Sequence, residues 1–197
     1  MPDFARLDGR LARSERTRRA VVDALLDLLG EGDLRPTAAR IAERARVSLR
    51  LVFHHFDDLE AIYSELADRQ AERVRPLTVP ISVELPFERR VEEFCAQRAR
   101  LVETLSPVRR SAVLMEPFQP ALAKRLKHAR DLMRADAIAA FAPELSKLAG
   151  GEKRAATAAL DVVTSWVAWE QMRRHQGLSE SEARGVMAAT IRALLAK

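Results

Sequence analysis

Two short helical segments separated by about three residues constrain this chain more than any other feature of its sequence. The first, TAARIAERA, begins at Thr37, a good N-cap residue, and turns Ile41 and small alanines toward one face. The second, SLRLVFHHF, is placed for capping by Ser48 and directs Val52 and Phe56 inward. Two helices this close in the chain must pack against each other across a tight turn.

The remainder of the sequence is also helical in pattern. A helix of about four turns is expected from Arg16 to stop signals at Gly30 and Gly32, and Asp57-x-x-Glu60 predicts a capped fourth helix. Prolines from position 76 to 86 indicate a connection rather than a strand. Helical periodicity then recurs over residues 87–105, 108–116, 121–142, 152–176 and, after a capping box at Ser179, 179–196. We expect an all-α protein of about nine helices.

The amino-acid composition limits the cellular compartment and the class of protein. The chain is 48% hydrophobic and 31% charged, as in a globular protein, and its one cysteine, Cys95, excludes an internal disulfide framework. No apolar run approaches the ~20 residues of a membrane helix, and the N-terminus lacks the apolar core of a signal peptide. We expect a cytoplasmic protein without a membrane partner.

Positive charge is concentrated at the N-terminus. Residues 1–20 contain six arginines against three acidic residues, so a net +3 of the total +5 lies there. A basic arm, placed at residues 1–15, is typical of nucleic-acid binding, although arginine-rich composition also arises from a GC-rich genome.

The capped pair of helices fits a helix-turn-helix, expected at about residues 38–57. Small alanines allow close packing, and the turn directs the N-terminal half of the second helix outward, toward a DNA major groove. Backbone N–H groups at the helix starts, near Thr37 and Ser48, are natural phosphate ligands.

The span from Arg16 to Leu66 resembles the N-terminal domain of TetR-type transcriptional regulators. The matching elements agree in order and spacing over about fifty residues: Gly32, Thr37, Ile41-Ala42, Val47-Ser48, Val52-Phe53, His55-Phe56 and Glu60. The resemblance implies a homodimer that binds a double-stranded DNA operator, with a helical ligand-binding and dimerisation domain after the helix-turn-helix. It divides the chain into a DNA-binding domain at 16–62 and a ligand-binding and dimerisation domain at 63–197.

Four residues depart from the family pattern. Arg46 stands where Gly is frequent, Arg50 where a small residue is common, Phe53 in place of Tyr, and Leu59 in place of Lys. The last two changes remove likely phosphate contacts, which Arg46 and Arg50 would compensate. Arg50 is open to three interpretations: reading a guanine edge, contacting phosphate, or remaining solvated.

The resemblance implies three sets of site residues. The expected DNA-binding residues are Thr37, Arg46, Ser48, Leu49, Arg50, Leu51, Phe53, His54 and His55. A small apolar effector would contact Phe94, Met115, Phe118, Met133, Phe141 and Trp166, although a Met and aromatic stripe is also typical of ordinary core. The expected dimer contacts are Trp169, Met187, Ile191 and Leu194.

The adjacent histidines suggest other chemistry, which helix geometry disfavours. Neighbours lie ~100° apart around a helix, so His54 and His55 are poorly placed to chelate one ion, and no carboxylate or nucleophile is positioned to form a catalytic dyad with them. We expect no catalytic residue, metal or cofactor. The alternatives left open are a ligand-blind regulator or activator of the same fold and, outside that class, a helical small-molecule-binding protein or enzyme.

Overall fold

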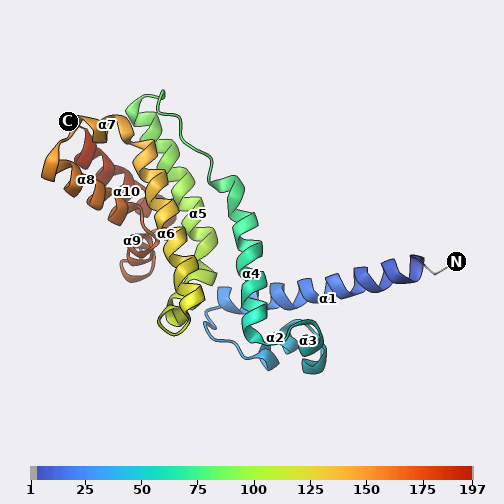
Figure 1. Cartoon of the computed structure of the whole chain (residues 1–197). Helices are drawn as coiled ribbons and strands as arrows, with labels where there is room; N and C mark the ends of the chain where they lie inside the picture. The colour runs from blue at the N-terminus through green and yellow to red at the C-terminus, as the bar shows by residue number, and fades with distance from the viewer. Residues whose placement is uncertain (1–3, 197) are drawn as a thin grey trace. The chain divides into compact units, whose positions relative to one another are not determined.

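The computed structural model describes the backbone of residues 4–196 and side chains from Leu11 onward. Within these residues it contains ten α-helices and no strand (Figure 1). The α-helices are α1 (Phe4–Gly30), α2 (Ala38–Arg44), α3 (Leu49–His55), α4 (Leu59–Val74), α5 (Phe87–Met115), α6 (Pro120–Ala140), α7 (Ala142–Lys147), α8 (Gly150–Thr164), α9 (Trp166–Glu170) and α10 (Glu180–Leu195). Short 3-10 turns occupy Arg75–Leu77 and Glu116–Phe118, and a π-helical turn occupies Gln171–His175. The all-α prediction is confirmed, and none of these helices is long and apolar enough to cross a membrane.

The chain forms two compact units, each with its own core. The first unit contains the residues up to Arg73 together with Pro107–Ala112, and the second contains the other described residues. In the first unit, α2 and α3 pack against each other and against α1 (Figure 1). Its core is formed by apolar side chains that include Leu25, Ile41, Val52, Phe56 and Ile62.

Helix α1 is longer at its N-terminus than expected. Its end follows the prediction, because Gly32 adopts φ +95° and its N–H bonds to the Leu29 carbonyl at 3.2 Å. Its start does not, because the backbone is helical from Phe4 rather than from Arg16. The segment expected to be an arm is rich in alanine, leucine and arginine, which favour helix. Residues 1–3 of the expected arm lie outside the described residues.

Helix α5 runs through a proline that was expected to separate two helices. Pro107 lies inside the helix, although a proline has no N–H for the helical ladder. In the turn before it, the Ser106 hydroxyl donates to the Val102 carbonyl at 2.7 Å. The helix therefore continues where the sequence pattern predicted a break, and residues 107–112 belong to the first unit.

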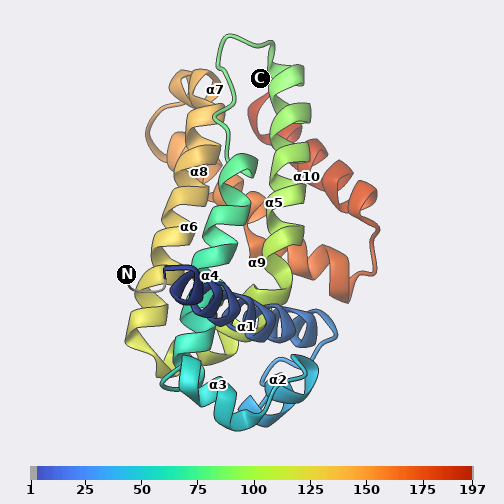
Figure 2. The same ribbon diagram turned by 90° about the vertical axis from the view of Figure 1, so that its right-hand side faces the viewer.

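The second unit is built from most of α5 and from α6 to α10. Helix α8 packs against α6 and α10 (Figure 2). Arg192 of α10 donates a hydrogen bond to Glu88 of α5 at 2.7 Å. The predicted single helix over 152–176 is wrong, because Ser165 is extended, with ψ 156°, and its hydroxyl caps α9. The predicted capping box beyond it is confirmed, because Ser179 and Glu182 form both of its hydrogen bonds at the start of α10. Gly177, between the two segments, has φ +70°.

Candidate nucleic-acid interface

Each of the two short helices begins at an N-cap, and the turn between them contains a residue with positive φ, Arg46. Thr37 Oγ1 accepts from the Arg40 N–H at 3.3 Å, and Ser48 Oγ accepts from the Leu51 N–H at 3.1 Å, as predicted. Between the helices, the Val47 N–H bonds to the Ala42 carbonyl at 3.0 Å. These local bonds fix the angle at which α3 leaves α2.

Helix α3 has a buried back and an exposed front. Val52 and Phe56 are 0% and 3% exposed and anchor the helix to the first-unit core. On the front, Leu49 and Phe53 are 42% and 47% exposed, although apolar side chains of this size usually seek burial. The predicted contact residues Arg50 and His54 are exposed beside them, whereas Leu51 and His55 are half-buried.

Arg18, one of the six arginines among residues 1–20, holds the C-terminal end of α3. Its Nη1 donates to the His55 carbonyl at 2.6 Å, and its guanidinium lies 4.4 Å from the centroid of the Phe56 ring. Its Nη2 also pairs with Glu65 on α4, which pairs in turn with Arg69. Arg18 is therefore engaged within the first unit, and its charge is not available to a polyanion in the way that the count of arginines suggested.

His55, whose carbonyl accepts from Arg18, also contacts α1 through its side chain. Its Nδ1 lies 3.4 Å from the Ser14 hydroxyl of α1, and its ring meets that of His54 edge-on with centroids 5.2 Å apart. Burial, followed by the nearby His54 and Arg18, lowers the pKa of His55 below its usual value. Among the described residues no group of three metal-ligating side chains is found.

The departures from the family pattern have different surroundings. Leu59 is half-buried against the first-unit core, so it contributes packing where a lysine would be solvated.

The N-cap of α4 is Asp58 and not Asp57. The Asp58 carboxylate accepts a hydrogen bond from the Ala61 N–H at 2.7 Å. The predicted capping role of Asp57 is wrong, because α4 begins at Leu59 and Asp58 is the residue directly before it.

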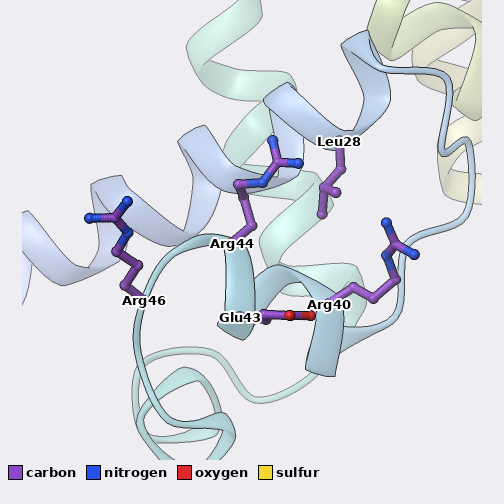
Figure 3. A pocket seen from close by; sticks show the side chains of 5 residues that line it. All are labelled: Leu28, Arg40, Glu43, Arg44 and Arg46. Carbon is purple, nitrogen blue, oxygen red and sulfur yellow. The ribbon is translucent and has the colours of Figure 1, made fainter.

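A surface hollow beside the α2–α3 turn contains three arginines. It is lined by Leu28, Arg40, Glu43, Arg44 and Arg46 (Figure 3). Two of the arginines are engaged: Arg44 forms a bidentate pair with Glu31 at 2.7 and 2.6 Å, and Arg40 lies 3.2 Å from Asp33.

The third arginine of the hollow, Arg46, is free. Its guanidinium lies on the opposite side of the hollow from that of Arg40 (Figure 3). Within the described part of the chain, the side chains of Arg46 and Arg50 have no hydrogen-bond or ion-pair partner. Both of these unpaired arginines are departures from the family pattern.

The six residues predicted to contact an effector are not all brought together. Phe94 and Phe141 are buried and stack edge-on, 5.3 Å between centroids, and Met133 and Trp166 pack partly buried against the same core. Met115 is half-buried, but Phe118 is 78% exposed on the turn after α5. These contacts account for Phe94 and Phe141 as core residues.

The residues predicted to form dimer contacts lie mostly inside the chain's own core. Trp169, Met187 and Ile191 are 0% exposed, and Leu194 is partly buried against the same core. Helical periodicity found the apolar face of α10 but did not show that this face is covered by α5 and α8. The exposed apolar side chains of this region are instead Val162, Val167 and Val186.

Solved structures share this fold across more than nine-tenths of the chain. A candidate TetR-family transcriptional regulator from Mesorhizobium loti is 21% identical, with a TM-score of 0.63, and the match covers 93% of this chain and 97% of the other. A transcriptional regulator from Rhodococcus is 16% identical, with a TM-score of 0.66 and coverage of 93% and 96%. A TetR-family regulator from Streptomyces coelicolor is 17% identical, with a TM-score of 0.63 and coverage of 92% and 81%. The chain therefore has the TetR-type fold, which confirms the predicted resemblance at the level of the fold.

Comparison with protein-family models and with curated proteins finds no match. The function is therefore inferred from the geometry of α2 and α3.

Proposed function

We propose that this protein is a sequence-specific, DNA-binding transcriptional regulator that acts as a homodimer on a palindromic operator. In this proposal α3 enters the major groove, and two copies of α3 about 34–36 Å apart reach successive grooves. The DNA contacts are those predicted from the sequence, from Thr37 to His55. Repression is the expected outcome, because a protein bound to an operator obstructs transcription.

The observation that carries the proposal is the two-sided character of α3. Its back is anchored by Val52 and Phe56, while its front exposes Leu49, Arg50 and Phe53. Exposed apolar side chains beside a free guanidinium suit a groove that presents thymine methyl groups and guanine acceptors. An exposed helix face with no such function would be expected to carry ordinary polar residues.

In this proposal Arg50 is the residue that recognises the DNA sequence. It lies in the first turn of α3, is exposed, and has no ion-pair partner among the described residues. A free arginine in this position suits a bidentate hydrogen bond to the O6 and N7 atoms of guanine. Of its three interpretations, we therefore favour base reading.

The test is a titration of wild-type and Arg50→Ala protein on the DNA upstream of its own gene and on a scrambled duplex. Arg50→Ala is expected to weaken binding to the preferred site by about 1–3 kcal/mol and to leave scrambled DNA nearly unaffected. Equal weakening on both duplexes would assign Arg50 to phosphate. Absence of any salt-sensitive, sequence-selective binding by the wild type would refute the proposed function.

Arg89→Ala is the matched control. Arg89 is also an exposed helical arginine, but it belongs to the second unit and pairs with Glu92 and Glu93 on its own helix. Its removal changes the net charge by the same amount, so affinity for the operator should stay near the wild-type value. A loss equal to that of Arg50→Ala would mean that overall charge, and not α3, determines binding.

Regulation by a small effector completes the proposal. An effector held in the second unit would weaken DNA binding only by its differential affinity for the DNA-competent and DNA-incompetent states. A regulator that ignores ligands would bind its operator equally well in the presence of every compound tested.

A further inference from the structure

Helix α5 buries two arginines in the second unit, Arg90 and Arg98, and they differ in their carboxylate partners. Arg90 is fully engaged: its guanidinium pairs with both Glu144 oxygens, at 2.8 and 2.5 Å. It also donates to the backbone carbonyls of Ala140, at 2.7 Å, and Leu85, at 3.0 Å. This is how a buried guanidinium is ordinarily accommodated, with a carboxylate partner and satisfied N–H groups.

Arg98, two turns further along α5, lacks such a partner. Its side chain is 2% exposed, and its Nη2 donates to the Met133 carbonyl at 2.9 Å. The nearest carboxylate oxygen, on Asp136, is 3.8 Å away, beyond hydrogen-bond distance. Its Nη1 is buried and has no hydrogen-bond partner among the described residues.

The surroundings leave this guanidinium poorly neutralised. Asp136 is 40% exposed, so water competes for its carboxylate and its attraction to Arg98 is weakened. Burial lowers the pKa of Arg98 to about 10, which still leaves it protonated at neutral pH. The interior of the second unit therefore holds a positive charge with one N–H group unused, an arrangement that destabilises the fold unless an anion completes it.

We propose that the effector of the second unit is an amphipathic carboxylic acid whose carboxylate accepts a hydrogen bond from Nη1 of Arg98. This inference rests on the proposed function and names its ligand class, replacing the purely apolar effector expected from the sequence. The apolar part of the ligand lies near the Phe94 ring, which is 4.9 Å from the guanidinium, and near Met133. Met133 is only partly buried, and a methionine side chain adapts readily to a new neighbour.

In this proposal Asp136 opposes the ligand carboxylate. Its side chain is 40% exposed, and it is the acid nearest the guanidinium. An incoming carboxylate would form a charge-assisted bond to Nη1, while the negative charge of Asp136, 3.8 Å from Nη2, would repel it. Removing the Asp136 charge should therefore strengthen binding.

The experiment measures ligand binding to the full chain without DNA, by thermal shift and calorimetry at pH 7. The probes are octanoate, decanoate, benzoate and phenylacetate, each compared with its primary amide at equal ionic strength. At least one carboxylate should raise Tm and bind more tightly than its amide by about 10- to 100-fold, the range for a hydrogen bond to a charged group. If no carboxylate is preferred over its amide, the proposal is wrong.

Three variants locate the effect. Arg98→Met should abolish the preference for carboxylate without lowering the Tm of the free protein, because it removes a poorly paired buried charge. Asp136→Asn should increase carboxylate affinity, and Arg89→Gln, which removes an exposed arginine of the same helix, should leave it unchanged. Weaker carboxylate binding in Asp136→Asn would overturn the proposal even if Arg98→Met fails to fold.

The outcomes for ligand and for DNA are separable. Loss of carboxylate preference with intact operator binding would refute this inference alone. Carboxylate binding by a protein that never retards DNA would refute the proposed function and leave the assignment of Arg98 in place.

Discussion

Arg46 occupies the left-handed region of backbone space, with φ +57°, at the turn that joins α2 to α3. A side chain in this region is strained, because its Cβ crowds the neighbouring carbonyl oxygen. Glycine avoids this strain, which explains why the family pattern favours glycine there. In this chain the position is occupied by an arginine despite the strain, and its unpaired guanidinium lies beside the proposed DNA-binding face.

Replacing Arg46 with glycine should therefore separate stability from DNA affinity. Arg46→Gly should raise the free energy of unfolding of the first unit by about 1 kcal/mol, because relief of strain exceeds the added freedom of glycine in the unfolded chain. The same variant should bind all DNA sequences more weakly, with a salt slope reduced by about one. Urea denaturation and a salt titration of binding check the two effects.

Arg46→Ala is the control for this comparison. Alanine keeps the strained backbone but removes the charge, so DNA binding should fall as in Arg46→Gly without a gain in stability. If Arg46→Ala is stabilised as much as Arg46→Gly, backbone strain is not the cause.

At the scale of the element, several helices begin at a single capping hydroxyl or carboxylate group, whereas α6, α7 and α8 begin without a side-chain cap. Ser48 caps α3, Ser165 caps α9 and Ser179 caps α10, each accepting a hydrogen bond from a first-turn N–H. At the start of α4 two aspartates compete for this role, and Asp58 takes it. The position of α4 matters for α3, because Glu65 of α4 binds the Arg18 that holds the C-terminal end of α3.

The adjacent aspartates offer a matched pair of variants. Asp58→Ala should lower the free energy of unfolding by about 1 kcal/mol, because the Ala61 N–H loses its acceptor. Asp57→Ala, at an exposed residue with no such bond, should change it by less than about 0.5 kcal/mol. Thermal or urea unfolding distinguishes the two, and equal losses would contradict the assignment of the cap to Asp58.

At the scale of the whole molecule, two separate apolar cores account for stability. The core of the second unit includes Cys95, the only cysteine in the chain, which is 1% exposed. Burial raises the pKa of its thiol to about 12, so the reactive thiolate is scarce in the folded state at neutral pH. The thiol thus reports directly on opening of this core.

Cys95 should resist modification until the second unit opens. With an opening free energy of about 5 kcal/mol, labelling by a thiol reagent at pH 8 should be at least about 10³-fold slower than for the unfolded chain. The measurement compares labelling in buffer with labelling in concentrated guanidinium chloride. Rapid labelling of the native protein would show that Cys95 is not in a closed core.

Features that depend on residues a few positions apart were determined by the sequence alone. The caps at Thr37, Ser48 and Ser179 and the helix end at Gly32 follow from side chain and backbone contacts within about four residues, so local chemistry is sufficient. The same local pattern identified the helix-turn-helix. The all-α class follows from helical periodicity along the whole chain.

Only the tertiary structure decided which charged and apolar groups are free. Arg18 counts as surface charge in the sequence, but it binds His55 and Glu65, which are 37 and 47 residues away. Trp169 was expected at an interface between copies and is buried in the chain's own core. Periodicity defines which face of a helix is apolar. The partner that covers this face, and the poor pairing of the charge at Arg98, depend on contacts between distant segments.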